Sequence, residues 1–111
     1  MALDFNMNIP PDEAIRIVDR AIVDKSITGV RIDYHTITAR DNSSCVIVVY
    51  EKHFYRVGNR LTITVIANNM SGATNIHCIS GGGGEGLFRF DWGAAGSFEN
   101  AVESALKEYR I

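Results

Sequence analysis

The stretch CVIVVYEKHFYRVGNRLTITVIAN, residues 45–68, predicts the centre of the fold. Its first part is β-branched and apolar at both odd and even positions, which is typical of a strand covered on both faces. Turn-forming residues follow, and after them Leu61, Ile63 and Val65 alternate with more polar neighbours, the period of a strand with one buried face. The stretch therefore predicts two antiparallel strands joined by a hairpin.

The flanking segments predict three more strands. Apolar and polar residues alternate over residues 3–9, and β-forming residues fill 30–39 and, after the turn NMSG, 73–80. In the segment 30–39 the alternation changes phase near His35, where we expect a β-bulge. Because short turns separate the last four strands, we expect each to be antiparallel to the next.

Two segments have the period of helices. Residues 11–26 begin with proline and acidic residues and carry one apolar stripe of Ile15, Val18 and Ile22. Ser97 is a good N-cap for a second helix, whose apolar face comprises Phe98, Val102, Ala105, Leu106 and Tyr109. The predicted order is β-α-β-β-β-β-α, an α+β fold with a curved antiparallel sheet, two helices on one face and a single domain over 1–111.

This order resembles that of TATA-binding-protein-like folds, in which two helices pack on the convex side of a bent antiparallel sheet. A likeness of element order carries no function, and in particular it does not imply DNA binding here.

One face of such a sheet has no helix to cover it. We expect Val46, Val48, Tyr50 and Ile66 on that face. Monomers rarely leave an apolar patch of this size in water, so the face would be covered by a second copy or would hold an apolar ligand. We favour a homodimer, since symmetric dimers are the commonest oligomers.

Charge and composition narrow the classes of function. The net charge of −2 makes a general nucleic-acid partner unlikely, and no segment is apolar for long enough to span a membrane. The first residues lack the pattern of a secretory signal, so we expect a cytoplasmic protein. Cys45 and Cys78 lie in apolar runs, as expected of two reduced, buried thiols.

A run of glycines is the first candidate site; it comprises Gly81, Gly82, Gly83, Gly84 and Gly86. The run matches G-x-G-x-x-G, but a β-like alternation follows where a dinucleotide site needs a helix, and the lysine of a P-loop is missing. We therefore expect no cofactor. The run can cradle an anion with its backbone N–H groups, or it can be a flexible connection to the second helix, which is the explanation we favour.

The second candidate is a basic and aromatic hairpin at residues 50–60. Its cations are Lys52, His53, Arg56 and Arg60, and such residues among aromatic rings suit an anionic small molecule or a nucleotide. The structural alternative, which we favour, is a sheet end protected by charge against edge pairing. Arg89, Asp91 and Trp92, just before the second helix, complete the candidate residues; Trp92 is expected to anchor the glycine-rich segment to the core.

The sequence does not support metal or acyl-transfer chemistry, because no histidine or cysteine pair has the spacing of ligands and G-x-S-x-G is absent. We therefore predict a non-enzymatic binding or interaction module whose partner is an anionic small molecule or a protein. The alternative is a small enzyme or nucleotide-processing module that uses His53 or His77 as acid or base, with Arg56 and Arg60 holding phosphate.

The segments YEKHFYRVGNRLTITV and FDWGAAGSFENAVESAL, together with the glycine run, resemble a family of small single-domain bacterial proteins of unknown function. The resemblance covers most of the chain and implies a stand-alone bacterial cytoplasmic protein. It supplies no activity, cofactor or catalytic residue.

Overall fold

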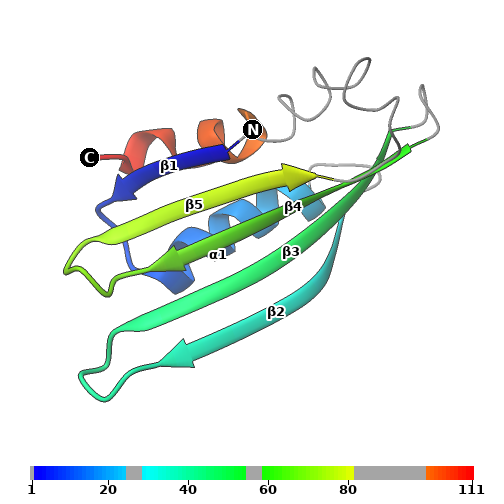
Figure 1. The fold of residues 1–111 in the computed structure, drawn as a ribbon. Helices are drawn as coiled ribbons and strands as arrows, with labels where there is room; N and C mark the ends of the chain where they lie inside the picture. The colour runs from blue at the N-terminus through cyan, green and yellow to red at the C-terminus, as the bar shows by residue number, and fades with distance from the viewer. Residues whose placement is uncertain (1, 25–28, 55–58, 82–99) are drawn as a thin grey trace.

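The computed structural model describes residues 2–24, 29–54, 59–81 and 100–111. They form an α+β fold in which one antiparallel sheet has the strand order β1-β5-β4-β3-β2 (Figure 1). The strands are β1 (Ala2–Met7), β2 (Val30–Thr38), β3 (Ser44–Phe54), β4 (Asn59–Asn68) and β5 (Thr74–Gly81). The predicted antiparallel sheet with two helices is confirmed, whereas the closer likeness to TATA-binding-protein-like folds stays a prediction.

The strict alternation of β4 decides which face of the sheet is buried. Ile63 and Val65 are fully buried beneath the helices, and their cross-strand partners in β3 are Tyr50 and Val48. The prediction that Val46, Val48 and Tyr50 lie on the uncovered face is therefore wrong, and of that group only Ile66 lies there. In β3 the odd-numbered and the even-numbered residues are both apolar, so the sequence of this strand alone does not indicate which side faces the helices.

Helix α1 (Pro11–Asp19) lies across one face of the sheet and packs on β3 and β4 (Figure 1). Ile15 and Val18 of the predicted stripe are buried, and the helix continues into a π-helical turn, Arg20–Asp24, that buries Ile22. The predicted end near residue 26 lies outside the described residues.

The described part of the second helix spans residues 100–106 and is followed by a 3-10 turn, Lys107–Tyr109. Val102 and Leu106 are fully buried in the same core as α1, as their spacing predicts, while Ser97 and Phe98 lie outside the described residues. The last residues then run beside β1. The Asn8 N–H donates to the Tyr109 carbonyl at 2.8 Å, and the Ile111 N–H donates to the Asn6 carbonyl at 2.9 Å. The C-terminus thus occupies the β1 edge of the sheet.

Strand β2 forms the other edge of the sheet, and all nine of its residues are exposed. The register with β3 shifts between Arg31 and Asp33, so the expected bulge is real but lies before His35. Sequence alternation alone misplaced it, because exposed β2 has no buried side to mark the position of the extra residue.

Candidate functional site

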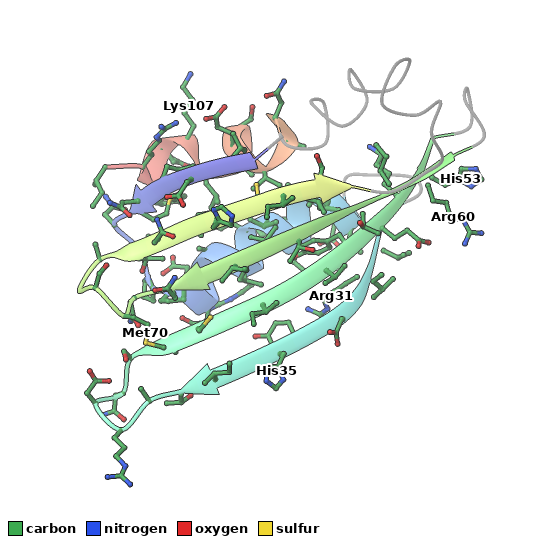
Figure 2. The ribbon with its side chains drawn as sticks, in the orientation of Figure 1. Arg31, His35, His53, Arg60, Met70 and Lys107 are labelled. Carbon is green, nitrogen blue, oxygen red and sulfur yellow. The ribbon has the colours of Figure 1, made fainter. Side chains whose placement is uncertain are left out.

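The basic hairpin lies at one end of the sheet, on the strands β3 and β4. His53 and Arg60 are cross-strand partners there, and Figure 2 shows their side chains near each other. Arg60 Nη1 lies 3.7 Å from Glu51 Oε1, and the Arg60 side chain is 68% exposed. Lys52 pairs with buried Leu61 and so belongs to the opposite face.

The beginning of the glycine run lies beside this hairpin. Gly81 ends β5 and pairs with Thr62, whose hydroxyl donates a hydrogen bond of 3.3 Å to the Gly81 carbonyl. Thr62 pairs in turn with Glu51, so Gly81 is two cross-strand rows away from the His53–Arg60 pair, in the next row on the same face of the sheet. The structure therefore brings two separately predicted candidate segments to one end of the sheet. We call Glu51, His53, Arg60, Thr62 and Gly81 the basic end.

Gly81 itself does not have the backbone of an anion nest. Within the described ranges, Gly72 is the glycine with a positive φ, at 101°, and it lies in the turn before β5. A Cβ atom built on Gly81 would meet nothing within 4 Å, so this position is an ordinary strand residue. The other candidate residues, Arg56, Gly82, Gly83, Gly84, Gly86, Arg89, Asp91 and Trp92, lie outside the described residues, and their roles stay predictions.

A hydrogen-bonded cluster on the uncovered face was missed by sequence reasoning. His77 Nδ1 lies 3.0 Å from Asp4 Oδ2, and Asn75 Nδ2 donates to Asp4 Oδ1 at 2.8 Å and to Asn6 Oδ1 at 3.2 Å. A carboxylate can only accept, so the Nδ1 atom carries the proton and Nε2 is left as the basic nitrogen. The partners lie about seventy residues apart in the chain, and only the pairing of β1 with β5 brings them together.

These hydrogen bonds stabilise the ionised form of Asp4. The bond from Asn75 and then the bond to His77 lower the pKa of the Asp4 carboxyl below its usual value of 3.8. Asp4 therefore remains negatively charged at neutral pH and holds the His77 ring in one orientation. This arrangement is the one a general base requires, although both side chains are substantially exposed.

His77 is not close to the basic end. It pairs with Ile66, which lies six residues along β4 from Arg60. At roughly 3.3 Å per residue, the separation is about 20 Å. The structure therefore brings His53 to Arg60 but does not bring His77 there.

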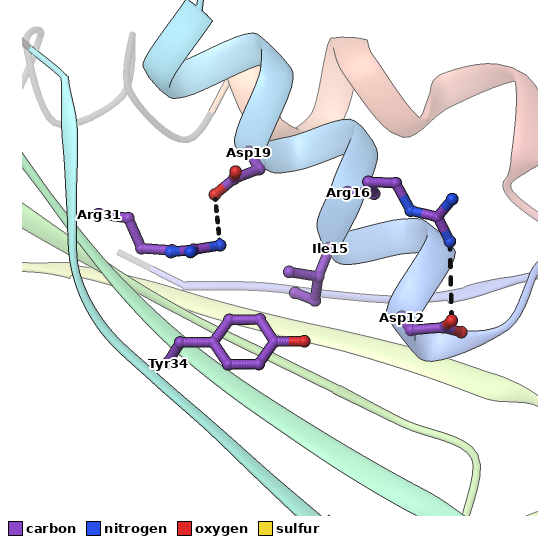
Figure 3. Close-up of a pocket in the computed structure, with 6 residues that line it drawn as sticks. All are labelled: Asp12, Ile15, Arg16, Asp19, Arg31 and Tyr34. Atoms are coloured by element: carbon purple, nitrogen blue, oxygen red, sulfur yellow. Dashed lines mark hydrogen bonds and ion pairs between the residues drawn. The ribbon is translucent and has the colours of Figure 1, made fainter.

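A pocket of about 290 Å³ separates α1 from β2 (Figure 3). Its charged side chains form two ion pairs: Arg16 Nη2 lies 3.6 Å from Asp12 Oδ2, and Arg31 Nη1 lies 3.4 Å from Asp19 Oδ1. The Arg31 guanidinium also lies over the Tyr34 ring, 4.9 Å from its centroid. Both arginines of this pocket are thus paired with carboxylates.

A family model described as a family of unknown function, DUF6054, matches residues 1–110. The chain belongs to this family. The predicted membership in a family of unknown function is confirmed, and its bacterial origin stays a prediction. No curated protein matches the chain.

The DUF6054 chain is also similar to the X-ray crystal structure of protein MLL2253 from Mesorhizobium loti. The TM-score is 0.53 at 12% sequence identity, and the match covers 97% of this chain and 96% of that chain. At this identity the likeness concerns the fold alone.

The described residues of the DUF6054 chain contain no group of three or more His, Cys, Asp or Glu side chains that could hold a metal ion. His77 and Cys78 point to opposite faces of the sheet, as their adjacency in a strand predicts. Cys78 is buried, whereas Cys45 is half-buried on the uncovered face. Neither cysteine is in a disulfide. In the same described ranges, no helix combines the length and the apolar character needed to cross a bilayer.

Proposed function

We propose that this protein is a non-enzymatic binding module that takes an anionic small molecule at the basic end of its sheet. The observation that carries the proposal is the pairing of His53 with Arg60 two cross-strand rows from Gly81, in the next row on the same face. Two candidate segments that are separate in sequence thereby meet on the face that no described helix covers. A protein surface presenting a carboxylate or phosphate to the same groups is included in the proposal.

The chemistry of Arg60 supports an anionic ligand. Its guanidinium offers a planar fork of N–H donors that matches the two oxygens of a carboxylate or phosphate. Its ion pair with Glu51 is long and exposed, and such pairs contribute little, about 0–1 kcal/mol. An incoming anion can therefore compete with Glu51 for the guanidinium.

The proposal includes a cytoplasmic location. Cys45 and Cys78 project from opposite faces of the sheet and are not in disulfides, which suits a reducing compartment.

Inorganic phosphate is the first probe, titrated into the protein while amide shifts are followed by NMR. We expect Arg60→Ala to weaken phosphate binding about tenfold, because one charge-assisted hydrogen bond contributes about 1.5–3 kcal/mol. Arg40→Ala is the matched control, since it removes the same charge from an exposed residue at the turn between β2 and β3. Equal affinity of the two variants would rule out the basic end, as would binding that does not weaken with added salt.

The second candidate function is an enzyme in which His77 acts as a general base oriented by Asp4. The 3.0 Å contact between the two side chains favours it. On that alternative, His77→Ala and Asp4→Asn would both abolish turnover of a substrate bound on the uncovered face. Under the binding proposal, neither variant changes phosphate affinity by more than about twofold, because the cluster lies about 20 Å from Arg60.

A further inference from the structure

The outer edge of β2 carries backbone groups that no described residue pairs with. The Ala39 N–H donates to the Ser43 carbonyl at 2.8 Å, so the backbone of residue 39 points toward β3. In an antiparallel pair the direction of these groups alternates along the strand. The N–H and C=O groups of Tyr34, Thr36 and Thr38 therefore point away from the sheet, into the position of a further strand.

The side chains of β2 are unusually apolar for an exposed edge. Its residues Val30, Ile32, Tyr34 and Ile37 have exposed fractions of 48%, 52%, 46% and 47%. Natural edge strands are kept short, charged or interrupted by proline, because an open edge recruits another strand. Strand β2 is nine residues long and has no proline, so it lacks two of these protections, and its bulge between Arg31 and Asp33 leaves residues 33–38 in regular pairing with β3.

The opposite edge of the sheet is protected by this chain's own C-terminus. Met7 of β1 forms an antiparallel bridge with Arg110. The C-terminal residues thus pair with the end of the β1 edge, whereas no described segment pairs with the outer edge of β2.

We propose that β2 pairs antiparallel with β2 of a second copy, about a two-fold axis at Tyr34, so that the two sheets form one continuous sheet. The two Tyr34 residues then exchange N–H to C=O hydrogen bonds across the axis. The flanking residues, Asp33 of one copy and His35 of the other, form non-hydrogen-bonded pairs, in which side chains approach most closely. The side chains are complementary in this register, because each Asp33 carboxylate faces a His35 imidazole whose ring N–H can donate a hydrogen bond to it.

This arrangement goes beyond the proposed function and leaves the basic end accessible. The two-fold axis is perpendicular to the sheet, so both helical layers lie on one side and both uncovered faces on the other. Ile47, Val49 and Ile66 of the uncovered face are half-buried, while Ile79 on the same face is 47% exposed. Exposure of apolar side chains therefore does not separate the two surfaces, and the open backbone groups of β2 make the edge the better place for the second copy.

Removal of a single N–H tests the pairing. Tyr34→Pro deletes the N–H at the two-fold axis, which no contact with β3 uses, and proline is tolerated where an edge N–H faces solvent. Tyr34→Val is the matched control, since it also removes the ring but keeps the N–H. We expect the parent and Tyr34→Val to sediment as dimers and Tyr34→Pro as a monomer. At a concentration where both variants are monomeric, their thermal unfolding temperatures should be equal, which shows that the proline does not disturb the fold.

Two results would overturn the proposal. One is a parent protein that stays monomeric at about 100 µM, where a dimer with a Kd of about 10 µM would be largely associated. The other is a Tyr34→Pro variant that dimerises as tightly as Tyr34→Val, which would place the second copy elsewhere, for example on the uncovered face.

A charge exchange tests the register. Asp33→Lys places a cation against His35 of the second copy and is expected to weaken dimerisation about tenfold. The double variant Asp33→Lys with His35→Asp places a lysine against an aspartate across the axis and should recover most of that loss. If the double variant is no tighter than Asp33→Lys alone, pairing about Tyr34 is wrong.

Discussion

Replacement of Tyr50 by phenylalanine is expected to stabilise the protein. The Tyr50 side chain is fully buried in the core, and among the described residues its hydroxyl is within hydrogen-bonding geometry of no partner, although the Asp19 carboxylate lies nearby. Tyr50→Phe keeps the ring and its packing and removes only that hydroxyl. A buried hydroxyl without a partner costs about 1–3 kcal/mol in proteins. We therefore expect the free energy of unfolding to rise by about 1 kcal/mol and the Tm by about 4 °C.

The same hydroxyl makes the parent protein sensitive to alkali. Burial, and then the negative charge of the nearby Asp19 carboxylate, raise the pKa of Tyr50 far above its usual value of 10.0. Above pH 10 the phenol ionises in the unfolded chain but stays protonated in the folded one, so the folded state binds more protons and stability falls as the pH rises. Tyr50→Phe removes this part of the alkaline loss.

Urea unfolding of the parent and Tyr50→Phe, at neutral pH and above pH 10, measures both effects, and an unchanged m-value confirms the same unfolding reaction. Tyr34→Phe is the control, because its hydroxyl belongs to an exposed side chain and its loss should change stability by less than about 0.5 kcal/mol. A Tyr50→Phe variant that is less stable than the parent by about 1 kcal/mol would refute the reasoning. It would mean that the hydroxyl has a partner in solution, for which the Asp19 carboxylate is the candidate.

Two further predictions concern Gly29 and Asp4. A Cβ atom on Gly29 would clash with the Ile22 carbonyl oxygen, so Gly29→Ala should destabilise the fold by about 1–3 kcal/mol, whereas Gly81→Ala, with open space around it, should not lower the Tm. Equal Tm values for these two variants would contradict the close approach. The lowered pKa of Asp4 means that its contribution to stability is present above pH 3.8 and is lost as the pH falls through the folded-state pKa. In Asp4→Asn, the free energy of unfolding should therefore fall less steeply as the pH is lowered into the acid range. If an NMR titration gives the Asp4 carboxyl its usual pKa, the hydrogen-bonded cluster is disproved.

Local patterns were sufficient for the elements of the fold. The alternation in β1 and β4 and the stripe on α1 each repeat with the period of one element, and a single buried face is enough to produce such a pattern. The turn residues between β4 and β5 likewise include Gly72, whose positive φ requires a residue of this kind. These predictions needed no knowledge of what lies beside each element.

The side of β3 that faces the core was not predictable in the same way. Val46 and Val48 are buried while Ile47 and Val49 are half-buried, yet all four are β-branched and apolar. Only the register with β4 distinguishes the two sets. The bulge in β2 was misplaced for a related reason. Neither the odd nor the even residues of this exposed strand are buried, so the sequence does not show where the alternation changes.

The candidate sites depended on tertiary structure to different degrees. His53 and Arg60 flank one hairpin, so their proximity follows from a local turn and was visible in the sequence. Asp4 and His77 are 73 residues apart in the sequence, and nothing local to either residue indicates the other. Their contact exists because β1 is inserted beside β5 at the edge of the sheet, a pairing decided by the packing of the whole chain around one core.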